Sequence, residues 1–127
     1  MIRRFWCCLL LAGVSPSLFA DLPGKSVLVL HSYYKGYRWT DDEGRGLDSV
    51  LLPELGASNI YIEYMDTKRF YGPGSLVQFP DLYARKFASR HFDAIVVTDN
   101  NAFDFLREYR DKLFLNTPVI FCGVNYF

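Results

Sequence analysis

The chain has 127 residues, of which 50% are hydrophobic and 22% are charged, and its formal net charge at pH 7 is zero. This composition excludes an intrinsically disordered chain, which has too few apolar residues to form a core. Zero net charge argues against nucleic acid as a partner, because phosphate binding needs a basic face. The length allows one domain.

Residues 1–20 have the pattern of a secretory signal peptide. Arg3 and Arg4 precede an uncharged apolar run over 5–14, and Ala20 gives the small residue at a cleavage site. The apolar run is too short for a transmembrane helix, which needs about 20 residues. We therefore predict export of a domain over 21–127, with a short buried helix at 1–20 as the alternative. Cys122 would then be the remaining cysteine, and its apolar neighbours predict a buried side chain.

Four short apolar runs predict four strands. The first is apolar throughout, which is typical of a central strand with both faces covered. In the second, Glu63 interrupts the run, which favours a place nearer an edge of the sheet. The predicted strands cover 26–31, 60–65, 94–98 and 118–122.

The first predicted helix begins at Thr40 and is limited by Pro53. Thr40 and Glu43 have the spacing of a capping box, in which each side chain bonds a backbone amide of the first turn. The expected apolar face consists of Leu47, Val50 and Leu51. Gly44 and Gly46 weaken this helix, and they indicate either close approach to a strand or ligand, or a loose first turn.

Two further helices are predicted from periodicity and caps. One covers about 80–89, with Leu82, Tyr83 and Phe87 toward the sheet. The other covers about 101–113, with Asp99 or Asn100 as its cap. Its apolar stripe is Ala102, Leu106, Tyr109 and Leu113.

Alternating strands and helices predict an α/β fold with a doubly wound parallel sheet. In such sheets, ligands bind beyond the carboxyl ends of the strands, near the point where the strand order reverses. Aromatic rings and short polar side chains follow the predicted strands and would suit a small-molecule pocket. The expected ligand-binding residues are Ser32, Tyr33, Trp39, Asp66, Asp99, Asn100 and Asn125. Helix capping by Asp99 or Asn100 and surface packing of the tyrosines are the alternatives.

No cofactor, metal or enzyme activity is expected. The Gly-x-Gly-x-x-Gly motif of a dinucleotide site does not follow the first strand. His31 and His91 fall at opposite ends of the predicted sheet, so they do not predict a metal site. Asp66 and Asp99 could serve a small secreted hydrolase as an acid/base pair, but no nucleophile motif accompanies them.

Five strings of the sequence occur in order at the predicted strand ends. They are VLVLHSY at 27–33, GYRWTD at 36–41, EYMDTKR at 63–69, FDAIVVTDNNA at 92–102 and VIFCGVN at 119–125. Together they resemble the periplasmic substrate-binding-like domain related to ABC transporter solute-binding proteins. In many bacteria that domain is the N-terminal extracytoplasmic sensor of membrane histidine kinases and diguanylate cyclases.

The resemblance implies a type I periplasmic-binding-protein fold, whose two lobes close on a small ligand. The chain would then be an N-terminal fragment, an incomplete first lobe located in the periplasm. Its partners would be a small-molecule ligand, the missing second lobe and a membrane-anchored signalling region. The alternative within the same chemistry is a solute-binding subunit of an ABC uptake transporter.

Overall fold

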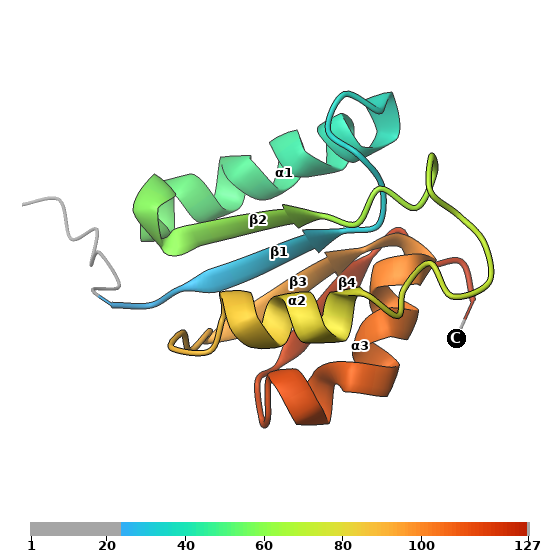
Figure 1. Ribbon diagram of the computed structural model, residues 1–127. Coiled ribbons are helices and arrows are strands. Elements are labelled where there is room, and N and C mark those ends of the chain that lie inside the picture. Colours follow the sequence, from blue (N-terminus) through green and yellow to red (C-terminus); the bar gives the residue numbers. More distant parts are fainter. Residues whose placement is uncertain (1–23, 127) are drawn as a thin grey trace, which may run out of the picture.

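The computed structural model describes residues 24–126, so the predicted signal peptide lies outside the described residues. The described chain folds into a parallel sheet between layers of helices (Figure 1). The strands are β1 (Val27–His31), β2 (Ile60–Tyr64), β3 (Ala94–Thr98) and β4 (Val119–Cys122). The helices are α1 (Arg38–Leu55), the 3-10 turn η1 (Ala57–Asn59), α2 (Phe79–Lys86) and α3 (Asp99–Leu113).

The strand order is β2-β1-β3-β4, and every pairing is parallel. Leu28 at the centre of the sheet pairs with Tyr61 on one side and Ile95 on the other. Helix α1 covers one face, whereas α2 and α3 cover the opposite face (Figure 1). This arrangement confirms the predicted doubly wound α/β fold. The order reverses between β1 and β3, which places the ligand edge expected for such folds at their carboxyl ends.

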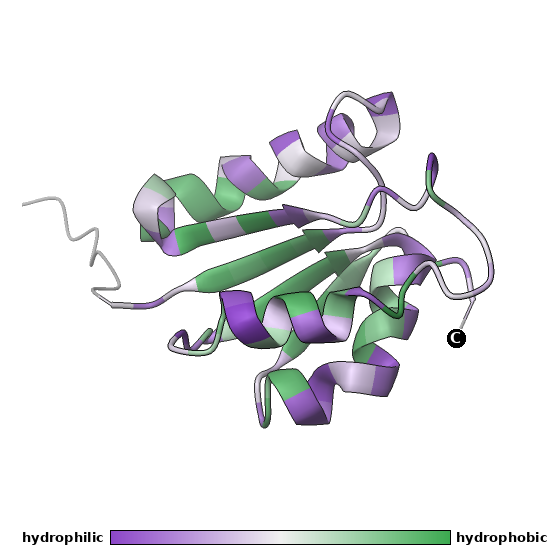
Figure 2. Cartoon of the chain, viewed as in Figure 1, coloured by the Kyte–Doolittle hydropathy of each residue, from purple (hydrophilic) through white to green (hydrophobic). Residues whose placement is uncertain are grey.

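Two apolar cores lie on the two faces of the sheet, and the central strands are hydrophobic over most of their length (Figure 2). Leu28 and Leu30 point into the larger core, where they meet the aromatic residues of α2 and α3. Val27 and Val29 point into the smaller core under α1. The continuous apolar run in β1 therefore reflects burial on both faces.

The first helix differs from the prediction at both ends. It begins at Arg38 and continues through Pro53 to Leu55. Pro53 lies in the last turn, where losing one backbone donor disrupts little of the helix. Tyr37 is the N-cap residue and its side chain makes no capping bond, so the predicted Thr40–Glu43 capping box is wrong.

Three side chains predicted to be buried are exposed. Val50 is 65% exposed because α1 meets the sheet through Leu47 and Leu51, one helical turn apart. Leu82 is 49% exposed because α2 buries the Phe79, Tyr83 and Phe87 row instead. Cys122 is exposed because it lies on the edge strand β4.

The third helix buries the predicted stripe. Ala102 and Leu106 are buried, and Tyr109 and Leu113 pack against the core. Phe105 is fully buried in the same core, although the sequence stripe did not include it. A Phe105→Ala change at such a site would cost about 3–5 kcal/mol.

Candidate functional site

Ser32 lies at the strand-order reversal and joins β1, β3 and α3. Its side chain is fully buried. The hydroxyl donates to the carbonyl oxygen of Thr98 at 2.6 Å and accepts from the backbone N–H of Ala102 at 2.8 Å. Ser32 thus accepts a hydrogen bond from one of the backbone N–H groups that have no acceptor within the first turn of α3. Ser32, predicted as a ligand-binding residue, is therefore a positioning group that is buried beneath the carboxyl ends of β1 and β3.

Thr67 and Asn101 extend the same network, and neither was among the predicted ligand-binding residues. Thr67 donates its hydroxyl to the Ser32 carbonyl at 2.7 Å and accepts from Asn101 Nδ2 at 2.6 Å. These bonds tie the segment after β2 to the ends of β1 and α3. The recurrence of a small polar residue two or three positions past a strand is the sequence signal that could have found them.

Asp99 begins α3 with a left-handed backbone, φ 64°, and its side chain is almost completely buried. Its Oδ1 accepts from Trp39 Nε1 at 3.1 Å. It therefore does not cap α3, and the N-cap residue Thr98 makes no side-chain cap either. The interpretation of Asp99 as a helix cap is wrong, because the carboxyl group points to α1 instead.

Glu43 on α1 lies near Asp99 across this edge: a Cβ built at Gly123 would contact both carboxyl groups, and the two groups affect each other's pKa. Burial, together with the nearby Asp99 charge, raises the pKa of Glu43 to about 7. Burial also raises the pKa of Asp99. When two carboxyl groups lie close together and are partly buried, binding of one proton by the pair is favoured over ionisation of both groups.

Gly123 closes the carboxyl pair from the β4 side. Its backbone has φ 67°, and a Cβ there would lie 2.5 Å from Glu43 Oε1 and 3.1 Å from Asp99 Oδ1. Only glycine combines this left-handed conformation with such a close approach.

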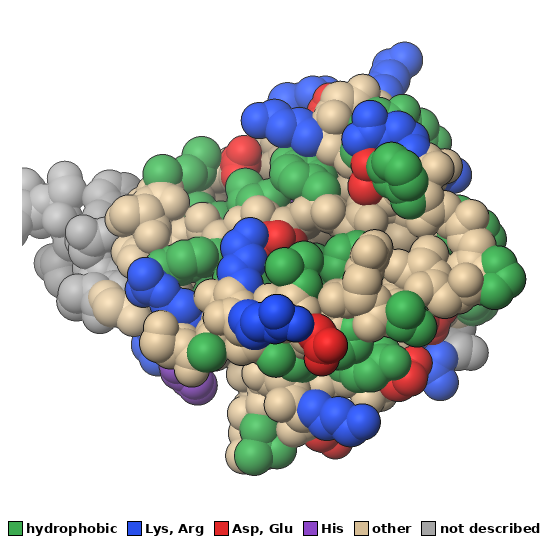
Figure 3. Space-filling view, in the orientation of Figure 1, with side chains coloured by type: hydrophobic (Ala, Val, Ile, Leu, Met, Phe, Trp, Pro, Cys, Tyr) green, Lys and Arg blue, Asp and Glu red, His purple; other side chains and the backbone are tan. Residues whose placement is uncertain are grey.

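Two tyrosine rings and a lysine lie beside the Glu43–Asp99 pair. The rings of Tyr33 and Tyr37 meet edge to face at 5.6 Å between centroids. Lys68 Nζ lies 4.8 Å from the Tyr33 centroid and 5.6 Å from that of Tyr37. Trp39 remains 54% exposed. Lys, Arg and hydrophobic side chains gather at this end of the molecule (Figure 3).

Asp66 belongs to a separate contact in the loop after β2. It has a left-handed backbone, φ 56°, and its carboxylate accepts from Arg69 at 2.6 and 2.8 Å. The Arg69 guanidinium also lies 4.2 Å from the Tyr34 ring centroid. The carboxyl partner of Asp99 is thus Glu43, and Asp66 is paired with a cation.

Asn100 and Asn125 bond to each other through the segment after β4. Asn100 Oδ1 accepts from the backbone N–H of Asn125 at 3.0 Å, and its Nδ2 donates to the Tyr126 carbonyl at 3.0 Å. The capping interpretation of Asn100 is wrong, because these bonds occupy its side chain. Asn125 itself is exposed.

His31 ends β1 on the α1 face and is buried. Its Nδ1 lies 3.0 Å from Thr98 Oγ1, and its ring stacks on Tyr64 at 5.0 Å. Burial lowers the pKa of His31 to about 4, so the imidazole is neutral near pH 7. Gly44 of α1 passes directly over this ring.

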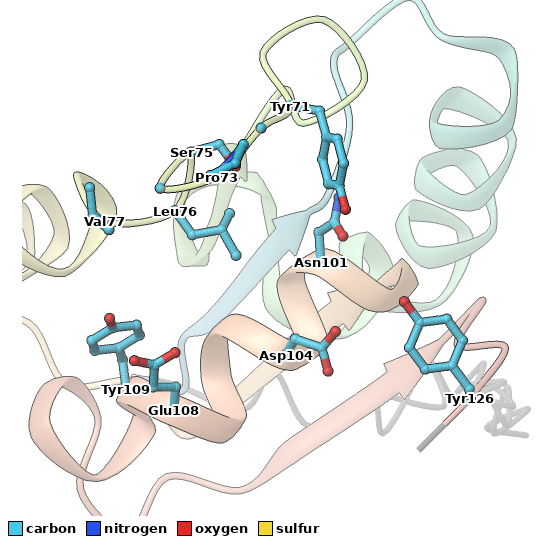
Figure 4. A pocket seen from close by; sticks show the side chains of 12 residues that line it. Tyr71, Pro73, Ser75, Leu76, Val77, Asn101, Asp104, Glu108, Tyr109 and Tyr126 are labelled. Carbon is cyan, nitrogen blue, oxygen red and sulfur yellow. The ribbon is translucent and has the colours of Figure 1, made fainter.

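A groove of about 600 Å³ lies between the 71–77 segment and α3, next to the carboxyl edge. Figure 4 shows Tyr71 pointing toward Asn101, with Asp104 and Tyr126 also on its lining. The seven predicted ligand residues do not line this groove. Asn101 belongs both to the groove and to the network under the edge, and so connects the two.

Among residues 24–126, no group of His, Cys, Asp and Glu side chains is arranged to hold a metal ion. Within the same range, no helix has the length and apolar character to cross a membrane. Comparisons of the chain with protein-family models, curated proteins and solved structures found no match.

Proposed function

We propose that this chain contributes to an exported small-molecule-binding domain that serves as the sensor of a bacterial signalling receptor. The observation that carries the binding role is Trp39. Its exposed ring is fixed through Asp99 at the point where the strand order reverses. A flat ring held by a buried carboxyl group is a preformed wall for a ligand. The sensor and periplasmic assignments rest on the sequence resemblance.

The aromatic and polar surroundings favour a ligand with a flat part and hydrogen-bonding groups. Trp39 and Tyr33 offer ring surfaces, and Lys68 offers a cation beside them. Purines, aromatic acids and short peptides share these features. The proposed site is therefore the edge formed by the loop after β1, the first turn of α1 and the start of α3, next to the Figure 4 groove.

The test is a thermal-shift screen of the purified chain against purines, aromatic acids, free amino acids and short peptides. A ligand at about 100 times its Kd adds about 2.7 kcal/mol to the free energy of unfolding. This raises Tm by roughly 10 °C or more in a domain of this size. We expect Trp39→Ala to reduce the affinity of the best compound about fivefold, since one aromatic contact is worth about 1 kcal/mol.

Tyr71→Ala is the matched control, because Tyr71 is an exposed aromatic residue of the groove and not of the edge. Binding that depends on Tyr71 and not on Trp39 would move the site to the groove and contradict the proposal. The absence of any shift across the panel would also count against it.

A further inference from the structure

The carboxyl groups of Glu43 and Asp99 connect the two helical layers at the carboxyl edge of the sheet. Glu43 comes from α1 on one face, and Asp99 begins α3 on the other. Their carboxyl groups interact, and Gly123 closes over both. One oxygen of each group, Glu43 Oε2 and Asp99 Oδ2, is buried without a donor among the described residues.

Two ionised carboxylates cannot satisfy this geometry. Each would leave a buried oxygen unpaired, and the two charges would repel at short range. One proton held by the pair removes one of the two charges and turns one carboxyl oxygen into a donor that the other carboxyl group can accept. We propose that Glu43 and Asp99 share one proton and form a pH-sensitive link between α1 and α3, which opens when both groups ionise.

The charged and titratable groups around the pair come from every neighbouring strand end. Tyr33 after β1 and Cys122 on β4 interact with both carboxyl groups: burial first, and the charges of the two carboxyl groups second, raise the pKa of Tyr33 and of Cys122. Lys68 after β2 favours the ionised form of Asp99. Trp39 donates a hydrogen bond to Asp99 Oδ1 at 3.1 Å, and the side chain of Thr98 favours the ionised form of Glu43. The proton is therefore a property of the pair, which titrates as a unit.

Trp39 couples the link to the exposed edge. Its indole N–H donates to Asp99 Oδ1 while its ring stands in solvent. When both carboxyl groups ionise, repulsion moves Glu43 and the first turns of α1, which carry Trp39. The consequence for ligand affinity, a loss as the pH rises through neutrality, rests on the proposed function. The shared proton does not rest on it.

The test follows Trp39 fluorescence between pH 5.5 and 8.5 without ligand, in the Trp6→Phe chain, which retains Trp39 as its one tryptophan. We expect an emission change with a midpoint near pH 7, where Glu43 titrates. Glu43→Gln should abolish it and hold the emission at its low-pH value, because the amide stays neutral and still donates to Asp99. Asp99→Asn should abolish it too, and asparagine tolerates the left-handed backbone.

Glu63→Gln is the matched control. Glu63 is a half-buried carboxylate on β2 that is paired with Lys86, so its removal should leave the Trp39 transition unchanged. His31 does not interfere, because its pKa of about 4 lies below the range. A flat profile, or a transition that survives Glu43→Gln, would overturn the shared proton.

Thermal melts give a second measure of the same link. The pKa of Glu43 is raised from 4.5 to about 7, so its stabilising contribution is complete below pH 4.5 and is lost as the pH rises through about 7. We expect Tm to fall by roughly 5 °C more in the unsubstituted chain than in Glu43→Gln between pH 5 and 8. Equal falls would contradict the link. A positive pH result with no ligand shift would count against the proposed function alone.

Discussion

At the scale of single residues, Ser32 shows why a side chain at a ligand edge need not touch a ligand. Its hydroxyl donates one hydrogen bond to the Thr98 carbonyl and accepts one from the Ala102 N–H, both of which are backbone groups. Its own carbonyl accepts from both the amide and the hydroxyl of Thr67. The two hydroxyl bonds fix the spacing of β1, β3 and α3, on which the position of Asp99 depends, and the two carbonyl bonds attach the segment after β2.

Ser32→Ala should therefore destabilise the chain by about 1–3 kcal/mol. The change leaves the buried N–H of Ala102 without a partner, and such a group pays its full desolvation cost. Urea unfolding followed by circular dichroism measures the difference. Ser49→Ala is the control, because Ser49 is exposed and bonds only within α1. Equal losses for the two variants would show that Ser32 is not a special anchor.

At the scale of elements, α1 contains two glycines with different surroundings. Gly44 passes over His31 with ordinary van der Waals spacing, 3.9 Å from a Cβ to Nε2, and Gly46 meets open space. The close approach of α1 to the sheet at Gly44 therefore leaves room for a methyl group. Neither residue requires a left-handed backbone, whereas Gly56 at the end of α1 has φ 72°.

Gly44→Ala and Gly46→Ala should each stabilise the chain by about 0.5–1 kcal/mol, because alanine loses less backbone entropy than glycine in a helix. The shift in Tm measures the gain. Gly56→Ala should have the opposite sign, since an L side chain at this backbone conformation is strained. A loss of stability in Gly44→Ala would show that the helix cannot tolerate contact with His31.

The strands were predictable to within a residue, because their apolar runs are burial patterns that need no partner to be recognised. The left-handed turns at Asp66 and Asp99 were not, since nothing in the local sequence distinguishes a capping Asp from one that turns the chain. Glu43 was misassigned for a related reason. Its spacing from Thr40 fits a capping box, but its partner lies 56 residues away in the chain, on another layer. Ser32 and Trp39 were selected because the strand-end rule specifies a place in the fold, and the structure places both residues near the carboxyl ends of β1 and β3.

At the scale of the whole molecule, the two edges of the sheet differ. On the edge strand β2, Glu63 is paired with Lys86, and charged side chains at an edge oppose pairing with another chain. On β4, Ile120 is 58% exposed because α1 extends over β1 and β2 and leaves this part of its face open. An uncharged edge strand with exposed apolar side chains is a template for pairing with another chain.

Ile120→Lys should reduce self-association of the chain without a large loss of Tm, because the side chain is already exposed. Sedimentation velocity over a range of concentrations measures this. Ile62→Lys on β2, where the side chain is 42% exposed, should have the smaller effect. If the parent chain and Ile120→Lys associate equally, the β4 edge is not a contact surface.

The central place of β1 has a consequence for how the molecule fluctuates. Hydrogen bonds to β2 and β3 hold both of its sides, and the Ser32 network fixes its carboxyl end. Its amides should exchange with solvent water only when the whole domain opens, whereas those of the two edge strands open locally. At the carboxyl ends of the strands, the rigid strand β1 thus meets surrounding segments that open more readily. The loops around Trp39 can therefore rearrange while β1 beneath them keeps its position.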